Sequence, residues 1–125
     1  MAVKWELEQR EGCIVAVATG NECVIADTQD ALDLAMGAVY EQDTNLIAMD
    51  KTLVSENFFD LRTGLAGSIL QKFVDYQIKV AIFGDFSDYA SEALKALMRE
   101  SNRGRDVFFV ATREEAVRRL AAIGA

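Results

Sequence analysis

The spacing of apolar and polar residues predicts that the chain begins with strands. Residues 5–9 alternate between apolar and polar side chains, and residues 13–18 are almost all apolar. A glycine-containing turn at residues 10–12 separates the two runs, so we expect an antiparallel hairpin. A second turn at residues 19–22 leads to a short third strand at residues 23–26.

Beyond residue 27 the apolar period lengthens to that of helices, which alternate with short apolar runs of strand length. The expected helices are residues 27–41, 65–76, 90–104 and from 113 onward, and the expected strands are residues 45–50, 79–83 and 107–111. Strands joined by helical crossovers lie parallel in one sheet. The sequence therefore predicts a single α/β domain over residues 1–125. It has a mixed sheet of five or six strands, with an antiparallel start and parallel later strands, packed with about four helices. A flavodoxin-like winding is the alternative.

The composition narrows the range of functions. The net charge of −7 opposes binding to nucleic acid or to an anionic membrane, because both are held chiefly by Lys and Arg. Histidine is absent, which removes the commonest general base and most transition-metal sites. We therefore expect a protein without catalytic residues, metal or cofactor.

No stretch of the sequence resembles a leader or a membrane span. The longest apolar runs, such as residues 15–18 and 107–111, have the length of strands. We expect a cytoplasmic protein in which Cys13 and Cys23 are reduced and buried. The arginines of the last third are interpreted as solvated helix positions or, alternatively, as a contact for an acidic partner or a second copy. They are Arg99, Arg103, Arg105, Arg113, Arg118 and Arg119.

Polar side chains follow two of the predicted parallel strands. Asp50 and Lys51 end the first of them, and Asp85 and Ser87 lie in the turn after the second. Ligands of open α/β sheets gather at the carboxyl ends of strands. These four residues are therefore the candidates for a pocket that takes a small molecule, with Asp85 as a plain turn residue in the alternative interpretation.

A second group of candidates lies mainly in the segment between residues 51 and 67. Its aromatic side chains fall outside the regular apolar stripes and stand beside charged residues, which is typical of an interface. The alternative is an aromatic cluster buried beneath a long loop. The candidates for a binding surface are Ser55, Phe58, Phe59, Asp60, Arg62 and Phe86.

Three stretches of the sequence resemble a known family. They are Ser55-Glu-Asn-Phe-Phe-Asp-Leu-Arg-Thr-Gly-Leu-Ala-Gly-Ser-Ile-Leu-Gln-Lys-Phe-Val-Asp-Tyr-Gln77, Lys79-Val-Ala-Ile-Phe-Gly-Asp-Phe-Ser87 and Glu100-Ser-Asn-Arg-Gly-Arg-Asp-Val-Phe-Phe109. Together they resemble a family of small bacterial proteins known as domain of unknown function 4180. The resemblance covers nearly the whole chain and implies no established activity.

A more distant resemblance is to STAS domains, the anti-sigma-factor antagonist fold. Those domains use a segment Asp-Ser-Ser-Gly-Leu that opens a helix, and the comparable segment here is Leu61-Arg-Thr-Gly-Leu65. In that family a partner kinase phosphorylates the central hydroxyl and thereby switches partner binding. The resemblance implies that Thr63 is the phosphoacceptor, at a helix start that favours an added phosphate. The alternative for Thr63 is a simple helix cap.

These observations favour a non-enzymatic regulatory domain that binds a protein partner through residues 51–67 and neighbouring Phe86. The alternative is a small-molecule-binding protein or minor enzyme that uses the strand-end candidates. An interaction domain is expected to expose Phe58 or Phe59, and a ligand site is expected to be concave. A third possibility is a homo-oligomer that buries the same aromatic residues across a two-fold axis.

Overall fold

Five strands form one mixed sheet in the computed structural model, which describes residues 3–124. They are β1 (Lys4–Arg10), β2 (Cys13–Thr19), β3 (Leu46–Asp50), β4 (Lys79–Phe83) and β5 (Val107–Val110). Their order across the sheet is the order along the chain. β1 is antiparallel to β2, and the later neighbours are all parallel. The predicted mixed sheet is confirmed.

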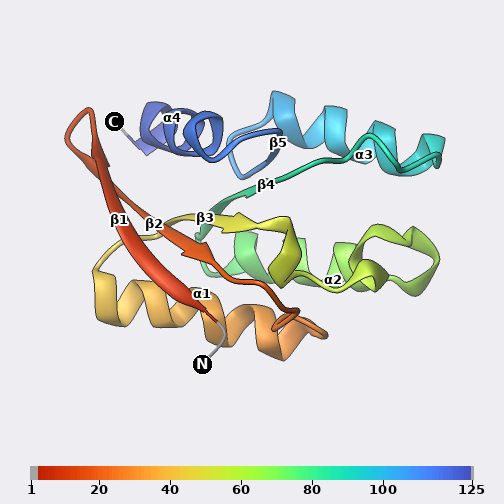
Figure 1. Cartoon of the computed structure of the whole chain (residues 1–125), viewed down its shortest axis with the longest axis horizontal. Coiled ribbons are helices and arrows are strands. Elements are labelled where there is room, and N and C mark those ends of the chain that lie inside the picture. Colours follow the sequence, from red (N-terminus) through yellow and green to blue (C-terminus); the bar gives the residue numbers. More distant parts are fainter. Residues whose placement is uncertain (1–2, 125) are drawn as a thin grey trace.

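Four α-helices cover the two faces of this sheet (Figure 1). They are α1 (Thr28–Gln42), α2 (Leu65–Asp75), α3 (Glu92–Arg103) and α4 (Arg113–Gly124). Apolar side chains of α1, α2 and α3 join one cluster with the sheet, and those of α4 form a second cluster on the other face. The flavodoxin-like alternative is wrong, because the strand order never reverses and one face takes all three crossover helices.

Alternation along β2 places one set of side chains in each cluster. Ala16 and Ala18 face α1 and α2, while Val15 and Val17 face α4, and all four are fully buried. α1 turns alanines toward the sheet, chiefly Ala31, Ala35 and Ala38. These small side chains allow α1 to approach the sheet closely.

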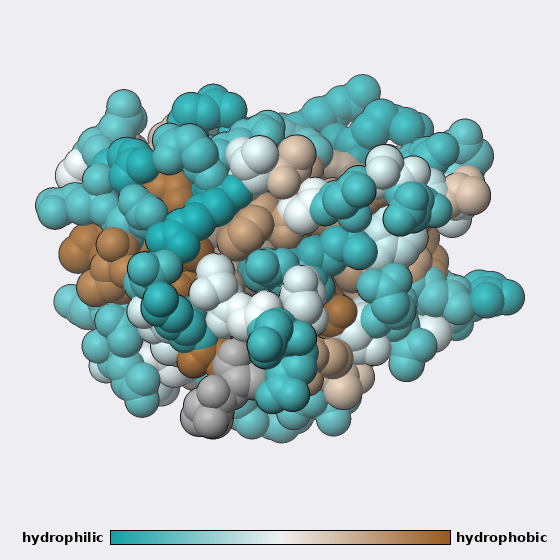
Figure 2. Space-filling view, viewed as in Figure 1, coloured by the Kyte–Doolittle hydropathy of each residue, from teal (hydrophilic) through white to brown (hydrophobic). Residues whose placement is uncertain are grey.

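The β1–β2 hairpin closes through a two-residue turn. Glu11 and Gly12 have φ values of 53° and 80°, as a type I′ turn requires, and Arg10 pairs with Cys13 across it. The surface beside the hairpin contains apolar patches, drawn brown in Figure 2 between the hairpin and the end of α1. Among residues 3–124, the exposed large apolar side chains are Leu7, Ile14, Tyr40, Val74 and Tyr76.

The prediction of a third strand at residues 23–26 is wrong. A single isolated bridge joins Ile25 to Val54. The Ile25 N–H donates to the Leu53 carbonyl, and the Ser55 N–H donates to the Ile25 carbonyl, both at 2.9 Å. The segment therefore fastens the loop after β3 instead of extending the sheet. Cys23, in the same segment, is exposed rather than buried.

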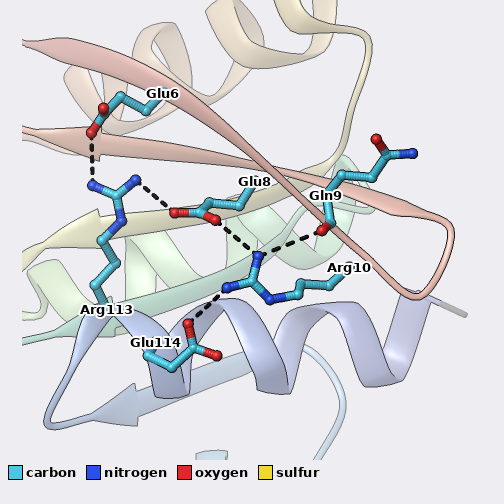
Figure 3. A network of polar contacts seen from close by, with 6 residues as sticks. All are labelled: Glu6, Glu8, Gln9, Arg10, Arg113 and Glu114. Atoms are coloured by element: carbon cyan, nitrogen blue, oxygen red, sulfur yellow. Dashed lines mark hydrogen bonds and ion pairs between the residues drawn. The ribbon is translucent and has the colours of Figure 1, made fainter.

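An ion-pair network joins the edge strand β1 to the start of α4 (Figure 3). Arg113 donates to Glu6 at 2.7 Å and to Glu8 at 2.9 Å. Arg10 donates to Glu8 at 2.9 Å and to Glu114 at 2.8 Å. Hydrogen bonding from Arg113 lowers the pKa of Glu6, and hydrogen bonding from Arg10 and Arg113 lowers that of Glu8. The network holds β1 to the body of the molecule.

On the opposite edge of the sheet, one side chain bonds the outward-facing backbone groups of Phe109. The amide of Asn102, at the end of α3, accepts from the Phe109 N–H at 2.7 Å and donates to the Phe109 carbonyl at 3.0 Å. Arg119 in turn donates to the Asn102 carbonyl at 2.6 Å and lies 4.3 Å above the Phe108 ring. Among the arginines of the last third, Arg103, Arg105, Arg113 and Arg119 thus each have a separate contact within the chain.

Candidate functional site

Two candidate sites lie at the end of the sheet where the parallel strands finish. The first is an open hollow of about 640 Å³, which we call the strand-end hollow. The second is the helix start, defined as residues 63–68, where the loop after β3 enters α2. The strand-end hollow is lined by Cys23, Asp50, Lys51, Thr52, Val54, Ser55, Glu56, Gly84, Asp85 and Asp88.

Lys51 is held in place at the rim of the strand-end hollow. Its aliphatic stem lies on Gly84, where a Cβ atom would be 2.8 Å from the Lys51 Cβ, and Gly84 has a φ of 155°. The ammonium lies 4.9 Å from the centre of the Tyr89 ring and 3.8 Å from a Glu56 carboxylate oxygen. The absence of a side chain at Gly84 therefore allows the lysine to cross from β3 toward the turn after β4.

The groups around Lys51 keep it charged. The neighbouring Tyr89 hydroxyl raises the pKa of Lys51 despite partial burial, and Glu56 and Asp85 add to the rise. Tyr89 itself donates to the Glu56 carboxylate at 2.9 and 3.1 Å. Burial raises the pKa of the Tyr89 hydroxyl, so it stays protonated at neutral pH. The hollow therefore presents one fixed cation among several carboxylates.

The predicted strand-end residues are only partly brought together. Asp50, Lys51 and Asp85 line the strand-end hollow, whereas Ser87 lines a smaller hollow on the other side of Gly84. The Ser87 N–H donates to the Asp85 carboxylate at 2.9 Å, and hydrogen bonds from Ser87 lower the pKa of Asp85. This is the turn role that the alternative interpretation gave to Asp85. Asp50 likewise caps the 3₁₀ helix Lys51–Leu53.

The topology gives the strand-end hollow no deep crevice. Ligand crevices of open α/β sheets form where the strand order reverses and helices part to opposite faces. The described sheet has no such reversal. Within residues 3–124, no group of three acidic or thiol side chains is placed to hold a metal ion. None of the described helices is long and apolar enough to cross a bilayer.

The prediction that Phe58 and Phe59 lie on a binding surface is wrong, and so is their burial across a two-fold axis. Their side chains are only 1% and 4% exposed within the single chain. The Phe59 ring centre lies 4.9 Å from that of Phe58 and 5.0 Å from that of Tyr89, and half-buried Phe86 packs at 5.9 Å. The loop turns back on the core, so these residues form the cluster of the alternative interpretation.

The polar candidates of the same loop are placed differently. Ser55 caps the 3₁₀ helix Glu56–Phe59 by accepting from the Asn57 N–H. Asp60 caps the next 3₁₀ helix, Leu61–Thr63, and forms two charged hydrogen bonds with Arg62 at 2.9 Å. The Arg62 side chain is 89% exposed. Arg62 is therefore on the surface, beside Thr63.

Thr63 lies at the entry to α2 and is exposed. Its single hydroxyl hydrogen is shared between the carbonyls of Asn57, at 2.7 Å, and Asp60, at 2.9 Å. The hydroxyl oxygen accepts from the Leu65 N–H at 3.2 Å. Gly64 occupies the N-cap position of α2 and has no side chain to cap it, so the cap comes from Thr63, one residue earlier. One hydroxyl thus joins the loop to the helix.

Small and polar residues surround Thr63 at the helix start. Gly64 has a φ of 76°, and Gly67 and Ser68 are exposed. The Ser68 hydroxyl lies 2.7 Å from that of Thr28 at the start of α1. Sequence analysis did not identify Thr28 or Ser68, because no local pattern indicates that positions 40 residues apart meet. The start of α2 is thus an open, polar surface.

The chain belongs to the family described as Domain of unknown function (DUF4180), which it matches over residues 10–120. The family resemblance stated from the sequence is confirmed. Among curated proteins none matches the sequence significantly.

A solved structure similar to this chain is the crystal structure of a protein inferred to be an anti-sigma factor antagonist, from Thermotoga maritima. The two chains are 14% identical, the alignment covers 93% of each, and the TM-score is 0.45.

Proposed function

We propose that this chain is a non-enzymatic regulatory domain that binds a protein partner through the helix start and residues 51–62 before it, under the control of phosphorylation at Thr63. The observation that carries the proposal is the placement of the Thr63 hydroxyl. It is exposed, it lies at the start of an 11-residue helix, and it fastens the preceding loop through two carbonyls.

Phosphorylation at this position changes the loop directly. A partner kinase transfers the γ-phosphoryl group of a nucleoside triphosphate to the Thr63 oxygen, and the hydroxyl proton is lost to the medium. The resulting ester oxygen has no hydrogen, so it cannot donate to the Asn57 and Asp60 carbonyls. The loop is released where it meets the helix.

The charges beside Thr63 add to this effect. A phosphate carries about −1.5 to −2 charges at neutral pH, and Asp60 is an ionised neighbour whose pKa is lowered by hydrogen bonding from Arg62. The phosphate therefore repels Asp60 and competes with it for exposed Arg62, while the N-terminus of α2 favours the added charge. A partner that contacts this surface meets a different shape and charge in each state.

The overall composition supports the same class of partner. The net charge of −7 disfavours nucleic acid and anionic lipid, and we expect a cytoplasmic protein partner. The aromatic anchors expected from the sequence take no part, since Phe58 and Phe59 are buried. The contact is therefore polar in character and centred on the helix start.

The test is capture of a partner from lysate of the native cells with immobilised variants. Thr63→Glu places a negative charge at the switch, and Thr63→Val removes the hydroxyl. Thr112→Glu, which makes the same change at the exposed residue that caps α4, is the matched control. We expect the amount of one captured protein to differ at least about tenfold, near 1.4 kcal/mol of binding free energy, between wild type and Thr63→Glu, with Thr112→Glu equal to wild type. Equal capture by all variants contradicts the proposal.

A second candidate function rests on the strand-end hollow. The fixed ammonium of Lys51 beside Asp50 and Asp85 matches a small polar ligand that carries both an anionic group and hydroxyl or amino groups. Binding of such compounds would shift the amide NMR signals of Gly84 and Asp85, and Lys51→Met would remove the shift. Shifts that persist in the variant, or none with wild type, argue against this candidate.

A further inference from the structure

The two edges of the sheet differ in how their backbone groups are satisfied. On the β5 edge, the Asn102 side chain bonds both the N–H and the carbonyl of Phe109. Unpaired backbone groups on an edge strand form a template for another strand, and here a side chain occupies those of Phe109. β1, with seven residues, is the other edge.

The hairpin geometry shows which groups of β1 face outward. In a two-residue hairpin the pair that closes the turn, here Arg10 with Cys13, is hydrogen-bonded, and such pairs recur at every second residue. The backbone groups of Trp5, Leu7 and Gln9 therefore point away from β2. Within residues 3–124, the hydrogen bonds of the structure give these groups a single contact, from Arg10 to the Gln9 carbonyl at 3.5 Å.

Large apolar side chains are also exposed beside this edge, as at an interface that another chain covers. Leu7 is 52% exposed in the middle of β1, and Ile14 on the neighbouring strand is 39% exposed. Both lie on the sheet face that carries Trp5, because side chains alternate along a strand. Apolar surface is visible at this end of the molecule in Figure 2, between the hairpin and α1.

We propose that β1 pairs antiparallel with β1 of a second copy of this chain, which joins two sheets into one continuous sheet across a two-fold axis. The partner is a second copy because, in a register centred on Glu6, the strand complements itself in charge and in apolar side chains. That register places Lys4 opposite Glu8 of the second copy and Trp5 opposite its Leu7, and each contact occurs twice. It provides about eight backbone hydrogen bonds between outward-facing groups of residues 3–9.

The charges select this register over its neighbour. A register centred on Leu7 also places two glutamates opposite each other, Glu6 and Glu8, which Arg113 of their own chain binds. What counts against it is that Lys4 then lies opposite Arg10 of the second copy, because like charges directly opposite each other are unfavourable. In the proposed register the one like-charged pair is Glu6 with itself. Each Glu6 is already bound by Arg113 of its own chain at 2.7 Å, so its charge is compensated before the strands meet.

The first test is the mass of the protein in solution, measured by sedimentation velocity from low micromolar to several hundred micromolar concentration. We expect a concentration-dependent shift from 13.8 kDa to twice that mass, since an interface made mostly of one strand pair is small and weak. A monomer at every concentration overturns the proposal.

Two variants identify the surface. Leu7→Pro removes an N–H that does not bond β2, and we expect a folded monomer, with the fold checked by circular dichroism. Lys4→Glu creates two like-charged pairs in the proposed register and is expected to weaken association about tenfold. Lys72→Glu makes the same charge change on exposed α2 and is the matched control. If the dimer dissociation constants of Lys4→Glu and Lys72→Glu are equal, the proposal is overturned. This comparison holds even if Leu7→Pro fails to fold.

Discussion

The segment between β3 and α2 has two halves with opposite environments. In the first half Phe58 and Phe59 are buried. Phe59 packs against the rings of Phe86 and Tyr89 after β4, and Phe58 packs against Phe109 of β5. In the second half Arg62, Thr63 and Gly64 are exposed. The buried half fixes the path of the chain, so the exposed half is presented in one position. Stability and availability to a partner therefore come from adjacent residues of one loop.

The largest expected effect breaks the buried half. Phe58→Ala removes a ring that is 1% exposed, and we expect the free energy of unfolding to fall by about 3–5 kcal/mol. Urea denaturation followed by circular dichroism measures it. Tyr40→Ala, at a side chain that is 80% exposed, is the control and should change stability by less than about 0.5 kcal/mol. A loss at Phe58 no larger than at Tyr40 contradicts the buried cluster.

A second change tests the packing of Lys51 on Gly84 at the rim of the strand-end hollow. Gly84→Ala places a Cβ 2.8 Å from the Lys51 Cβ in a backbone conformation that suits glycine, and overpacking of this kind costs about 1–3 kcal/mol. Gly67→Ala is the matched control, because a Cβ there meets nothing within 4 Å and Gly67 is in a helix. It should stabilise by about 0.5–1 kcal/mol. Thermal unfolding of both variants tests the opposite signs, and equal effects would contradict the packing of Lys51 on Gly84.

A smaller effect is expected in the exposed half. Thr63→Val keeps the shape of the side chain and removes the hydroxyl that contacts Asn57, Asp60 and Leu65. We expect a loss of about 1 kcal/mol in urea denaturation, and Thr63→Ser should recover most of it. If the valine variant is as stable as wild type, the hydroxyl does not fasten the loop.

The smallest effect is a pH dependence at the surface. Hydrogen bonds from Arg62 lower the pKa of Asp60 below its ordinary 3.8. The contribution of Asp60 to the free energy of unfolding is therefore complete above its pKa in the unfolded chain. It is lost as the pH falls through the lower pKa that Asp60 has in the folded chain. Carboxylates titrate between about pH 6 and pH 2. Across this range the melting temperature should fall less steeply with acid for Asp60→Asn than for wild type. Identical slopes would sink this account of the pair.

The fold could be predicted from the sequence wherever a regular period was present. The strand at Lys79–Phe83 and the helix that begins at Leu65 have the predicted starts. Residues 23–26 look like a strand locally, but Ile25 bonds a loop carbonyl instead of a strand. Whether the Ile25 backbone bonds a strand or a loop depends on tertiary structure, and local strand propensity gives no information about it.

The candidate site was predictable in part. Thr63 was singled out through the resemblance to STAS domains, and its hydroxyl lies at a helix start as the alternative interpretation expected. The burial of Phe58 and Phe59 does not follow, since an irregular segment has no period to show which way a ring points. The contact of Lys51 with Tyr89 and Gly84 joins three separate segments, and it requires the sheet register.

The most direct test of the central claim is to map phosphate on the protein recovered from its native cells. Intact mass spectrometry of the affinity-purified chain, followed by fragmentation, would be compared with Thr63→Val purified in the same way. The account predicts a single added phosphate on Thr63 in wild type and none in the variant. An unmodified wild-type chain, or a phosphate at another residue that persists in the variant, would contradict the proposed switch.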